Sequence, residues 1–276
     1  MLSYYADLHI HTIHSDGVLH PREIVDIAIN SHISVIAIAD HDSVAGLDEA
    51  IDYAKNRIEI IPSVELSANS GSRDVHILGY YIDHHSKDLL DFLEEFKNYR
   101  VLRAKKIVEK LYKAGVKVDF ELVKHIAGNS VMGRPHIAEA LLESGYVRSI
   151  SEAFARYLGY HSPYYEPKKE LIPKEAIKKI KKWKGIPVIA HPGMLGSYNG
   201  LIYELIKEGL MGVEVWHPEH TQKQMDDLYE IAMKNDLLMT GGSDFHGLPR
   251  GYCKIGEYGC GKEEVFNLKE YAKKGA

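Results

Sequence analysis

Two histidines near the start of the chain have a spacing that suits metal binding. His9 and His11 stand two positions apart in an apolar, strand-like run over residues 6–12. Because alternate residues of a strand point to the same face, we expect their imidazole rings to project side by side. Asp16 follows on the next loop and adds a carboxylate. Neutral imidazole and carboxylate groups bind divalent transition metals, so this segment predicts part of a metal site.

The same residue types return along the chain, mostly where an apolar run ends. These further candidates are histidines and carboxylates: Asp40, His41, Glu65, His76, His191, His217, Asp244 and His246. A single histidine at a strand end is more often a hydrogen-bonded core or surface residue than a ligand, and one motif alone predicts little. The repeated placement at strand ends favours one joint site.

The composition is that of an ordinary globular protein. The chain has 276 residues, of which 45% are hydrophobic and 26% charged. This length suits one barrel-sized domain with an insertion, or two domains. The two cysteines, Cys253 and Cys260, are expected to be free thiols in a reducing compartment. Zinc binding by this pair is a weaker alternative, because the spacing differs from that of a zinc ribbon.

Net charge and hydropathy restrict the partners. The formal net charge of −5 argues against binding of long nucleic acid, which requires a basic surface, but it is compatible with a small phosphorylated substrate. The first residues do not form a basic and apolar leader, and no apolar run is long enough to span a bilayer. We therefore expect a cytoplasmic protein without membrane contact, and the sequence predicts no oligomeric state.

Strands and helices alternate in both terminal parts of the chain. The apolar patterns predict strands at 6–12, 34–39, 58–66, 75–82, 187–190, 212–216 and 237–240, and helices at 21–31, 47–56, 173–183, 199–208, 221–234 and 263–273. Such alternation predicts parallel strands joined by right-handed crossovers. The turn at 69–72 is too short for a crossover, so strand 75–82 should run antiparallel to its predecessor. That arrangement would place His76 beside Glu65.

The middle of the chain shows helical patterns only. A long amphipathic helix is predicted over 87–114, followed by helices over 119–127, 135–144 and 151–158. The predicted organisation is therefore an α/β barrel of residues 1–85 and 167–276 with an all-helical insertion, residues 86–166, that caps the substrate. The best architecture is a distorted seven-stranded, TIM-like (β/α)7 barrel. Chemistry in such barrels collects at the carboxyl ends of the strands, where most of the candidate residues are expected.

Six motifs, in order, resemble those of the polymerase and histidinol phosphatase (PHP) superfamily. They are DLHIHT at 7–12, ADHD at 39–42, VELS at 64–67, HILGY at 76–80, AHP at 190–192 and GSDFH at 242–246. Members of this superfamily have a distorted seven-stranded barrel with up to three divalent metals and are chiefly phosphoesterases.

The resemblance implies three metal sites. The first would be held by His9, His11, Glu65 and Asp244; the second by Glu65 as a bridge with His76 and His191; the third by Asp16, His41 and His246. We therefore expect two or three divalent ions, and this mixed ligand set suits manganese, iron or zinc without choosing among them.

Phosphate-ester hydrolysis is the chemistry that such sites favour. A bound metal lowers the pKa of its water toward ~7, and metal pairs about 3.5–4 Å apart clamp the attacking and leaving oxygens. We expect in-line attack by a metal-bridging hydroxide without a covalent enzyme intermediate. Asp40 is expected either to orient a ligand histidine or to cap a turn, and the two roles have equal weight.

Two further residues are candidates for substrate binding. The segment Gly-Arg-Pro-His at 133–136 resembles a motif of the subgroup that acts on nucleoside 3′,5′-bisphosphates and short RNA ends. Arg134 at a helix start suits phosphate recognition, and the alternative is a surface arginine beside a helix cap. His217 is expected to contact the substrate phosphate or to protonate the leaving oxygen.

The leading hypothesis is a metal-dependent phosphoesterase that removes the 3′-phosphate of a nucleoside 3′,5′-bisphosphate. A 5′-3′ exonuclease on short RNA and a histidinol-phosphate-type phosphatase are the alternative enzymes. A non-catalytic metal-binding module is an alternative of another class, and its expected mark would be missing ligand residues. No ligand position of the resemblance is missing from the sequence.

Overall fold

The computed structural model describes residues 4–71, 73–128, 130–167, 171–248, 251 and 253–275. The chain forms two compact units: residues 1–90 together with 171–276, here called the barrel unit, and residues 91–170, here called the helical unit. The insertion predicted over 86–166 overlaps the helical unit. Its role as a cap over the substrate remains a prediction.

The barrel unit is built on one sheet of seven strands within the described residues. They are β1 (Ala6–Ile10), β2 (Val35–Ile38), β3 (Glu59–Ser70), β4 (Arg73–Tyr80), β5 (Ile186–Ile189), β6 (Gly212–Trp216) and β7 (Leu238–Gly241). Their spatial order follows the sequence, as in a barrel. Strand β4 is antiparallel to both of its neighbours, whereas the other neighbouring pairs are parallel.

The segment after β7 returns to β1 and nearly closes the barrel. Ala6 exchanges backbone hydrogen bonds with Cys260, and the His11 amide donates to the Phe245 carbonyl at 2.9 Å. Strands β1 and β7 are also in contact. This closure confirms the predicted distorted seven-stranded barrel. Cys253 and Cys260 are free thiols, as the sequence predicts, and the structure shows that both are buried.

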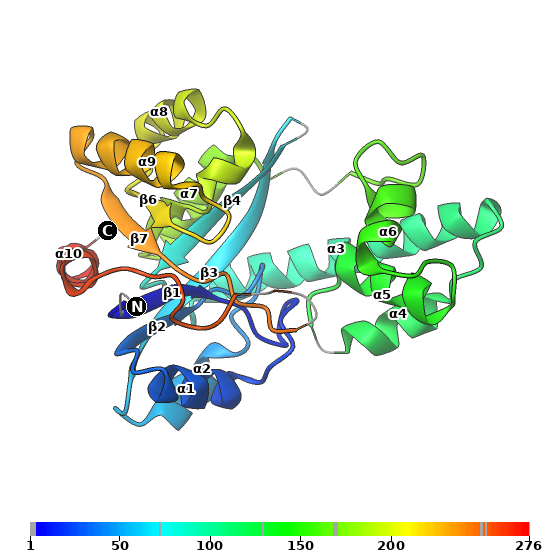
Figure 1. The fold of residues 1–276 in the computed structure, drawn as a ribbon, viewed down its shortest axis with the longest axis horizontal. Coiled ribbons are helices and arrows are strands. Elements are labelled where there is room, and N and C mark those ends of the chain that lie inside the picture. Colours follow the sequence, from blue (N-terminus) through cyan, green and yellow to red (C-terminus); the bar gives the residue numbers. More distant parts are fainter. Residues whose placement is uncertain are drawn as a thin grey trace. The chain divides into compact units, whose positions relative to one another are not determined.

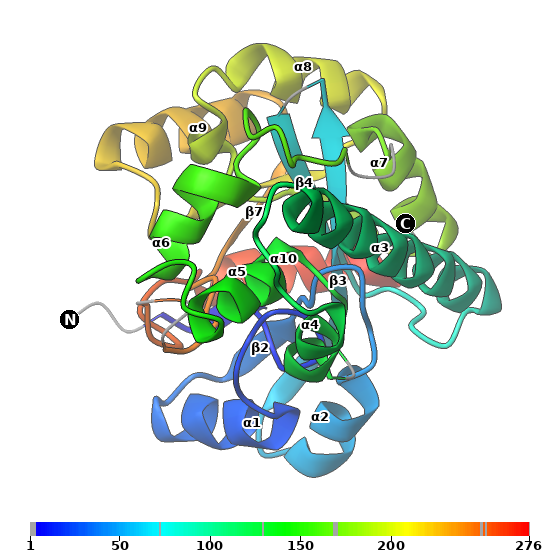
Figure 2. The ribbon, with the colours of Figure 1, turned by 90° about the vertical axis from the view of Figure 1, so that its right-hand side faces the viewer.

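Helices cover the outside of the barrel (Figures 1 and 2). They are α1 (Pro21–Asn30), α2 (Leu47–Ala54), α7 (Pro173–Lys182), α8 (Asn199–Lys207), α9 (Gln222–Lys234) and α10 (Lys262–Lys273). Helix α7 shows why they pack there: Ala176, Ile177 and Ile180 recur at helical spacing and are buried. Among the described residues, no helix combines the length and apolarity that crossing a membrane requires.

Strands β3 and β4 form a long hairpin, visible in Figure 1 as the cyan pair. The ladder runs from the Ser63–Tyr80 pair to the Ser70–Arg73 pair. The hairpin therefore confirms the predicted antiparallel arrangement, but it extends past the predicted strand end at residue 66. Polar residues join the strands here because each finds a backbone partner across the hairpin.

The helical unit contains most of α3 (Lys87–Lys113), then α4 (Phe120–Ala127), α5 (Arg134–Glu143) and α6 (Ile150–Ala153). Its apolar core includes Leu111, Ile137 and Leu141. The single helix predicted over 151–158 is wrong in detail, because α6 continues as a π-helical turn, η1 (Phe154–Leu158). The Gly159 amide donates to the Phe154 carbonyl five residues earlier, which is the hydrogen bond of a π-helix.

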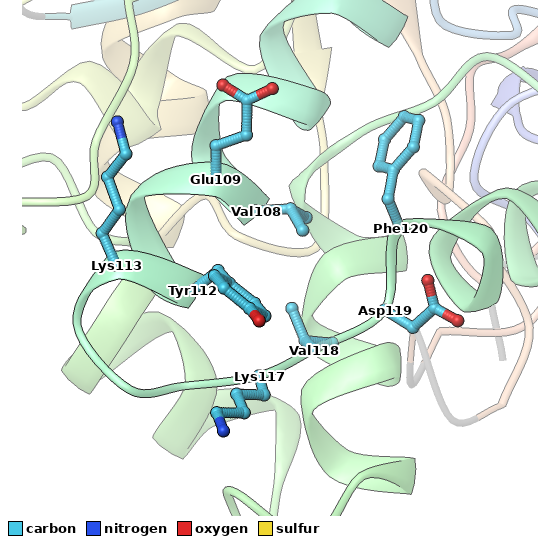
Figure 3. Close-up of a pocket in the computed structure, with 8 residues that line it drawn as sticks. All are labelled: Val108, Glu109, Tyr112, Lys113, Lys117, Val118, Asp119 and Phe120. Carbon is cyan, nitrogen blue, oxygen red and sulfur yellow. The ribbon is translucent and has the colours of Figure 1, made fainter.

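A pocket of about 470 Å³ lies in the helical unit between the end of α3 and the start of α4 (Figure 3). Val108, Tyr112, Val118 and Phe120 give it an apolar wall, and charged side chains stand at its edge. Its lining includes no candidate metal ligand. The metal chemistry predicted from the sequence must therefore be sought in the barrel unit.

Candidate metal centre

The nine candidate ligands converge at one end of the barrel. They form overlapping groups in which each residue offers a ligand atom within 4.8 Å of the others in its group. The residues are His9, His11, Asp16, His41, Glu65, His76, His191, Asp244 and His246. They come from β1, β3 and β4 and from the loops that follow β1, β2, β5 and β7. We call this place the barrel mouth.

The first group contains two imidazoles and two carboxylates. His9 Nε2 lies 3.3 Å from Glu65 Oε2 and 3.5 Å from Asp244 Oδ1. His11 Nε2 lies 3.4 Å and 3.0 Å from the same two oxygens. Two ligands at about 2.0–2.2 Å from one tetrahedral ion would stand roughly 3.4 Å apart. The four atoms thus have the separations of ligands around a common ion.

The lack of hydrogen-bond partners for these buried atoms also supports a metal site. His9 Nε2, His11 Nε2 and Glu65 Oε2 are buried and have no hydrogen-bond partner among the described residues. Buried polar atoms are normally hydrogen-bonded, because an unpaired one is costly. Three such atoms around one point form a set of donors that a divalent cation would satisfy. The residues present therefore fit the metal that the sequence predicts.

Glu65 joins the first group to a second. Its other oxygen, Oε1, lies 2.9 Å from His76 Nδ1 and 3.1 Å from His191 Nε2. Burial opposes ionisation of this carboxyl, but the surrounding histidines, led by His41, outweigh burial and hold the pKa of Glu65 well below its usual range. The two oxygens of one ionised, fully buried carboxylate therefore face two groups of histidines.

Asp16, His41 and His246 form a third group with His11. His246 Nε2 lies 3.2 Å from Asp16 Oδ1, and His41 Nε2 lies 3.9 Å from Asp16 Oδ2. His41 also turns its Nδ1 toward Glu65 Oε2 at 2.9 Å, so it faces two groups. Burial opposes protonation of His246, but Asp16 and Asp244 outweigh it and raise its pKa to about 10.

Two of the candidate ligands have left-handed backbone. His191 has a φ of 29° and Asp244 a φ of 49°. Such a conformation in a residue other than glycine costs on the order of 1–3 kcal/mol and occurs often at functional sites. The His191 amide donates to Glu214 Oε2 at 2.7 Å, which helps to hold this residue in place.

Glu214 is a residue of the site that the sequence analysis missed. It lies in β6 and is fully buried. Its Oε1 lies 2.9 Å from His9 Nδ1, and Oε2 accepts from the His191 amide. A carboxylate on Nδ1 fixes the proton there and leaves Nε2 free to bind a metal. The available signal was an acidic residue inside an otherwise apolar strand.

Asp40 contacts the loop after β1 and touches no histidine directly in the described hydrogen bonds. It accepts from the Thr12 amide and hydroxyl, both at 2.7 Å, and from the Ser15 hydroxyl. Ser15 Oγ in turn lies 3.5 Å from His11 Nδ1. These contacts favour the turn-holding role over direct orientation of a ligand, and a catalytic role of Asp40 remains a prediction.

His217 lies at the edge of the first group and is fully buried. Its Nδ1 accepts from the Glu219 amide at 3.1 Å, and its Nε2 lies 3.4 Å from Asp244 Oδ2. Because Nδ1 accepts, the neutral ring carries its proton on Nε2. His217 therefore presents a donor next to the candidate ligands, and its role toward substrate remains a prediction.

Arg134 opens helix α5 in the helical unit, as predicted for a helix start. Its guanidinium donates to the Leu158 carbonyl at 3.0 Å and lies 4.8 Å from the centre of the Tyr160 ring. His136 caps the same helix by accepting from the Gly133 amide at 3.0 Å. The histidine of the Gly-Arg-Pro-His segment therefore has a structural role as a helix cap. Phosphate binding by Arg134 remains a prediction.

The fold and the mouth together define a class: a nearly closed barrel that gathers buried histidines and carboxylates where barrel enzymes carry their chemistry. The sequence matches the model of the PHP domain family over residues 7–239, and the chain belongs to this family.

Three known proteins illustrate the similarity. The 5′-3′ exoribonuclease of Haemophilus influenzae is 37% identical, over 91% of this chain and 93% of that protein. The 3′,5′-nucleoside bisphosphate phosphatase of Chromobacterium violaceum is 33% identical, over 91% of this chain and 90% of that protein. A crystal structure of a proposed metal-dependent phosphoesterase from Bifidobacterium adolescentis has a TM-score of 0.88 and 31% identity, covering 95% and 94% of the two chains.

These similarities identify the chain as a metal-dependent hydrolase of phosphoesters. The alternative of a non-catalytic metal-binding module loses its support, because the similar proteins bear the names of hydrolases.

Proposed function

We propose that this enzyme removes the 3′-phosphate of nucleoside 3′,5′-bisphosphates with divalent ions bound at the barrel mouth. The observation that carries the proposal is the ionised Glu65, whose two oxygens face histidines on either side. The 33% identical phosphatase of C. violaceum supports the substrate class.

The proposed ligands fall into the three groups described for the mouth. His9, His11, Glu65 and Asp244 would hold the first ion, Glu65 with His76 and His191 the second, and Asp16, His41 and His246 the third. When bound, such ions activate water at neutral pH and neutralise charge on the phosphoryl oxygens. Manganese, iron and zinc all suit this mixture of imidazole and carboxylate.

Residues other than the ligands would position the reaction. Glu214 holds His9 through Nδ1 and His191 through its amide. Asp40 holds the loop that carries His11. His217 would donate a hydrogen bond from its Nε2–H to a phosphoryl oxygen, since that atom is the donor of the neutral ring. Protonation of the leaving-group oxygen would require the doubly protonated ring, which returns to the neutral form when it gives up a proton. Arg134 would bind a phosphate of the substrate that is not cleaved.

A panel of substrates tests the proposal. Phosphate release is measured with the manganese-loaded enzyme on adenosine 3′,5′-bisphosphate, adenosine 5′-monophosphate, adenosine 3′-monophosphate and histidinol phosphate. We expect the highest kcat/KM on the 3′,5′-bisphosphate, with adenosine 5′-monophosphate as the product. A higher kcat/KM on histidinol phosphate would contradict the proposed substrate class.

A second candidate is 5′-3′ exonuclease action on short RNA, favoured by the 37% identical exoribonuclease of H. influenzae. Both reactions hydrolyse a phosphoester next to a ribose, so one site suits either. A 5′-phosphorylated oligoribonucleotide of about five residues separates them. Release of mononucleotides faster than phosphate is released from the bisphosphate would favour the exonuclease.

A further inference from the structure

A second cluster of metal-binding residue types lies outside the barrel mouth. His84 and His85 occupy the turn between β4 and α3, and Asp48 lies in the first turn of α2. Both ring nitrogens approach the same oxygen: His84 Nε2 lies 3.0 Å and His85 Nε2 3.3 Å from Asp48 Oδ1. The ring centres are 4.1 Å apart.

The approach of two histidines to one oxygen of Asp48 is not explained by its contribution to the stability of the fold. The Asp48 side chain is 65% exposed, so water can solvate its charge without any protein partner. Exposed ion pairs contribute only about 0–1 kcal/mol, and a second imidazole on the same oxygen adds little. If both rings were protonated, they would also repel each other across a short distance. The turn nevertheless aims two successive side chains at one carboxylate oxygen.

We propose that His84, His85 and Asp48 form a separate binding site for a divalent transition-metal ion such as Zn²⁺. Two imidazole nitrogens and one carboxylate oxygen are suitable ligands, and water would complete a four-coordinate ion. The observed nitrogen–oxygen separations are close to the roughly 3.4 Å expected between two ligands of one tetrahedral ion.

The three residues differ in how firmly they are held. The His84 side chain is only 14% exposed, and Asp48 lies in the first turn of helix α2. His85 is 68% exposed and lies on the solvent side. The site is therefore open to ions from solution, and His85 can be changed without disturbing the core.

Zinc binding by full-length variants tests the site. Equilibrium dialysis against Zn²⁺ with metal analysis gives the number of ions per chain for the wild type, His85→Ala and Asp48→Asn. His161→Ala serves as the matched control, because this exposed histidine lies outside the cluster. We expect both cluster variants to lose one zinc ion per chain at micromolar Zn²⁺, with at least tenfold weaker binding at that site. The control should bind as the wild type does.

Phosphoesterase activity provides the second measurement. His85→Ala and Asp48→Asn should keep the manganese-dependent rate within about twofold, because neither residue belongs to the mouth. Equal zinc stoichiometry and affinity in the wild type and both variants would overturn the proposal. The number of zinc ions bound does not depend on which phosphoester the enzyme cleaves. A negative result for zinc binding would therefore leave the proposed function untouched, and a negative result in the substrate panel would leave this site untouched.

Discussion

In the barrel unit the buried acidic and imidazole side chains gather at one mouth, whereas the buried core of the helical unit is mainly apolar. Among the described residues, candidate ligand atoms of the mouth such as His9 Nε2 have no hydrogen-bond partner. In the helical unit Arg134 and Arg156 lie over the Tyr160 and Tyr157 rings and donate to backbone carbonyls. The barrel mouth thus presents unpaired ligand atoms that suit a metal cation, whereas the helical unit has positively charged arginine side chains held by its own residues.

The two units therefore suit different tasks. Histidines and carboxylates concentrated in a buried mouth cost free energy unless a cation compensates them, so the mouth is built around metal. Stacking on an aromatic face holds the plane of an arginine in one orientation. The comparison predicts that changes in the mouth alter metal content, whereas changes in the helical unit alter substrate use alone.

Glu65→Gln should give the largest effect. The amide keeps the shape of the side chain but removes the charge that two groups of histidines share, so we expect more than ~100-fold loss of activity with loss of bound metal. Metal analysis and phosphate release measure the two losses, and Glu143→Gln on the exposed end of α5 is the control. Full metal content in Glu65→Gln would show that the mouth is not built around this carboxylate.

Glu214→Gln should have a smaller effect of the same kind. The variant retains bulk but cannot fix the His9 proton on Nδ1 as a carboxylate does, so metal affinity should fall about 10–100-fold. Titration of chelator-treated protein with Mn²⁺ gives the dissociation constant. As a control, Glu230→Gln on the surface of α9 should leave the dissociation constant for Mn²⁺ unchanged. An unchanged constant for Glu214→Gln would contradict the role of Glu214 in orienting His9.

Arg134→Ala, in the helical unit, should affect substrate use and leave the bound metal in place. We expect KM for the bisphosphate to rise about tenfold while metal content stays that of the wild type, because the proposed role of the lost guanidinium is to bind a phosphate of the substrate. Steady-state kinetics and metal analysis on the same preparation measure both. Lost metal with unchanged substrate affinity would contradict the assignment.

Asp40→Ala should act mainly on stability. Its removal leaves the Thr12 amide, the Thr12 hydroxyl and the Ser15 hydroxyl without their buried acceptor, at a cost of about 1–3 kcal/mol. Thermal unfolding of the metal-free protein should therefore begin several degrees lower. Asp40→Asn keeps one acceptor oxygen, so its melting temperature should lie between those of Asp40→Ala and the wild type. Equal melting temperatures for Asp40→Ala and the wild type would exclude this stabilising role.

Periodicity and residue chemistry were sufficient to predict much of the molecule. Apolar runs marked every strand of the sheet, and the spacing of His9 and His11 predicted rings that stand 5.1 Å apart. The short turn after β3 predicted the antiparallel hairpin, which places His76 Nδ1 2.9 Å from Glu65 Oε1. These predictions depend on local backbone geometry, which sequence spacing determines directly.

Other features depend on partners that are distant in the chain. The extra length of β3 and β4 arises from cross-strand pairing of polar residues such as Asn69 and Ser70, which carry no apolar signal. Glu214 acquires its role from His9, 205 residues away. The contacts of Asp40 with Thr12 and Ser15 likewise form only when β1 and β2 pair. Spacing along the sequence cannot reveal such partners.

The most direct test is anomalous diffraction from crystals of the enzyme soaked with Mn²⁺ and phosphate. We expect manganese peaks at the barrel mouth, one of them roughly 2.0–2.3 Å from His9 Nε2, His11 Nε2 and a Glu65 oxygen, with phosphate bound beside them. Manganese bound elsewhere on the chain, with His9, His11 and Glu65 making no contact to it, would contradict the claim that this mouth is the catalytic centre.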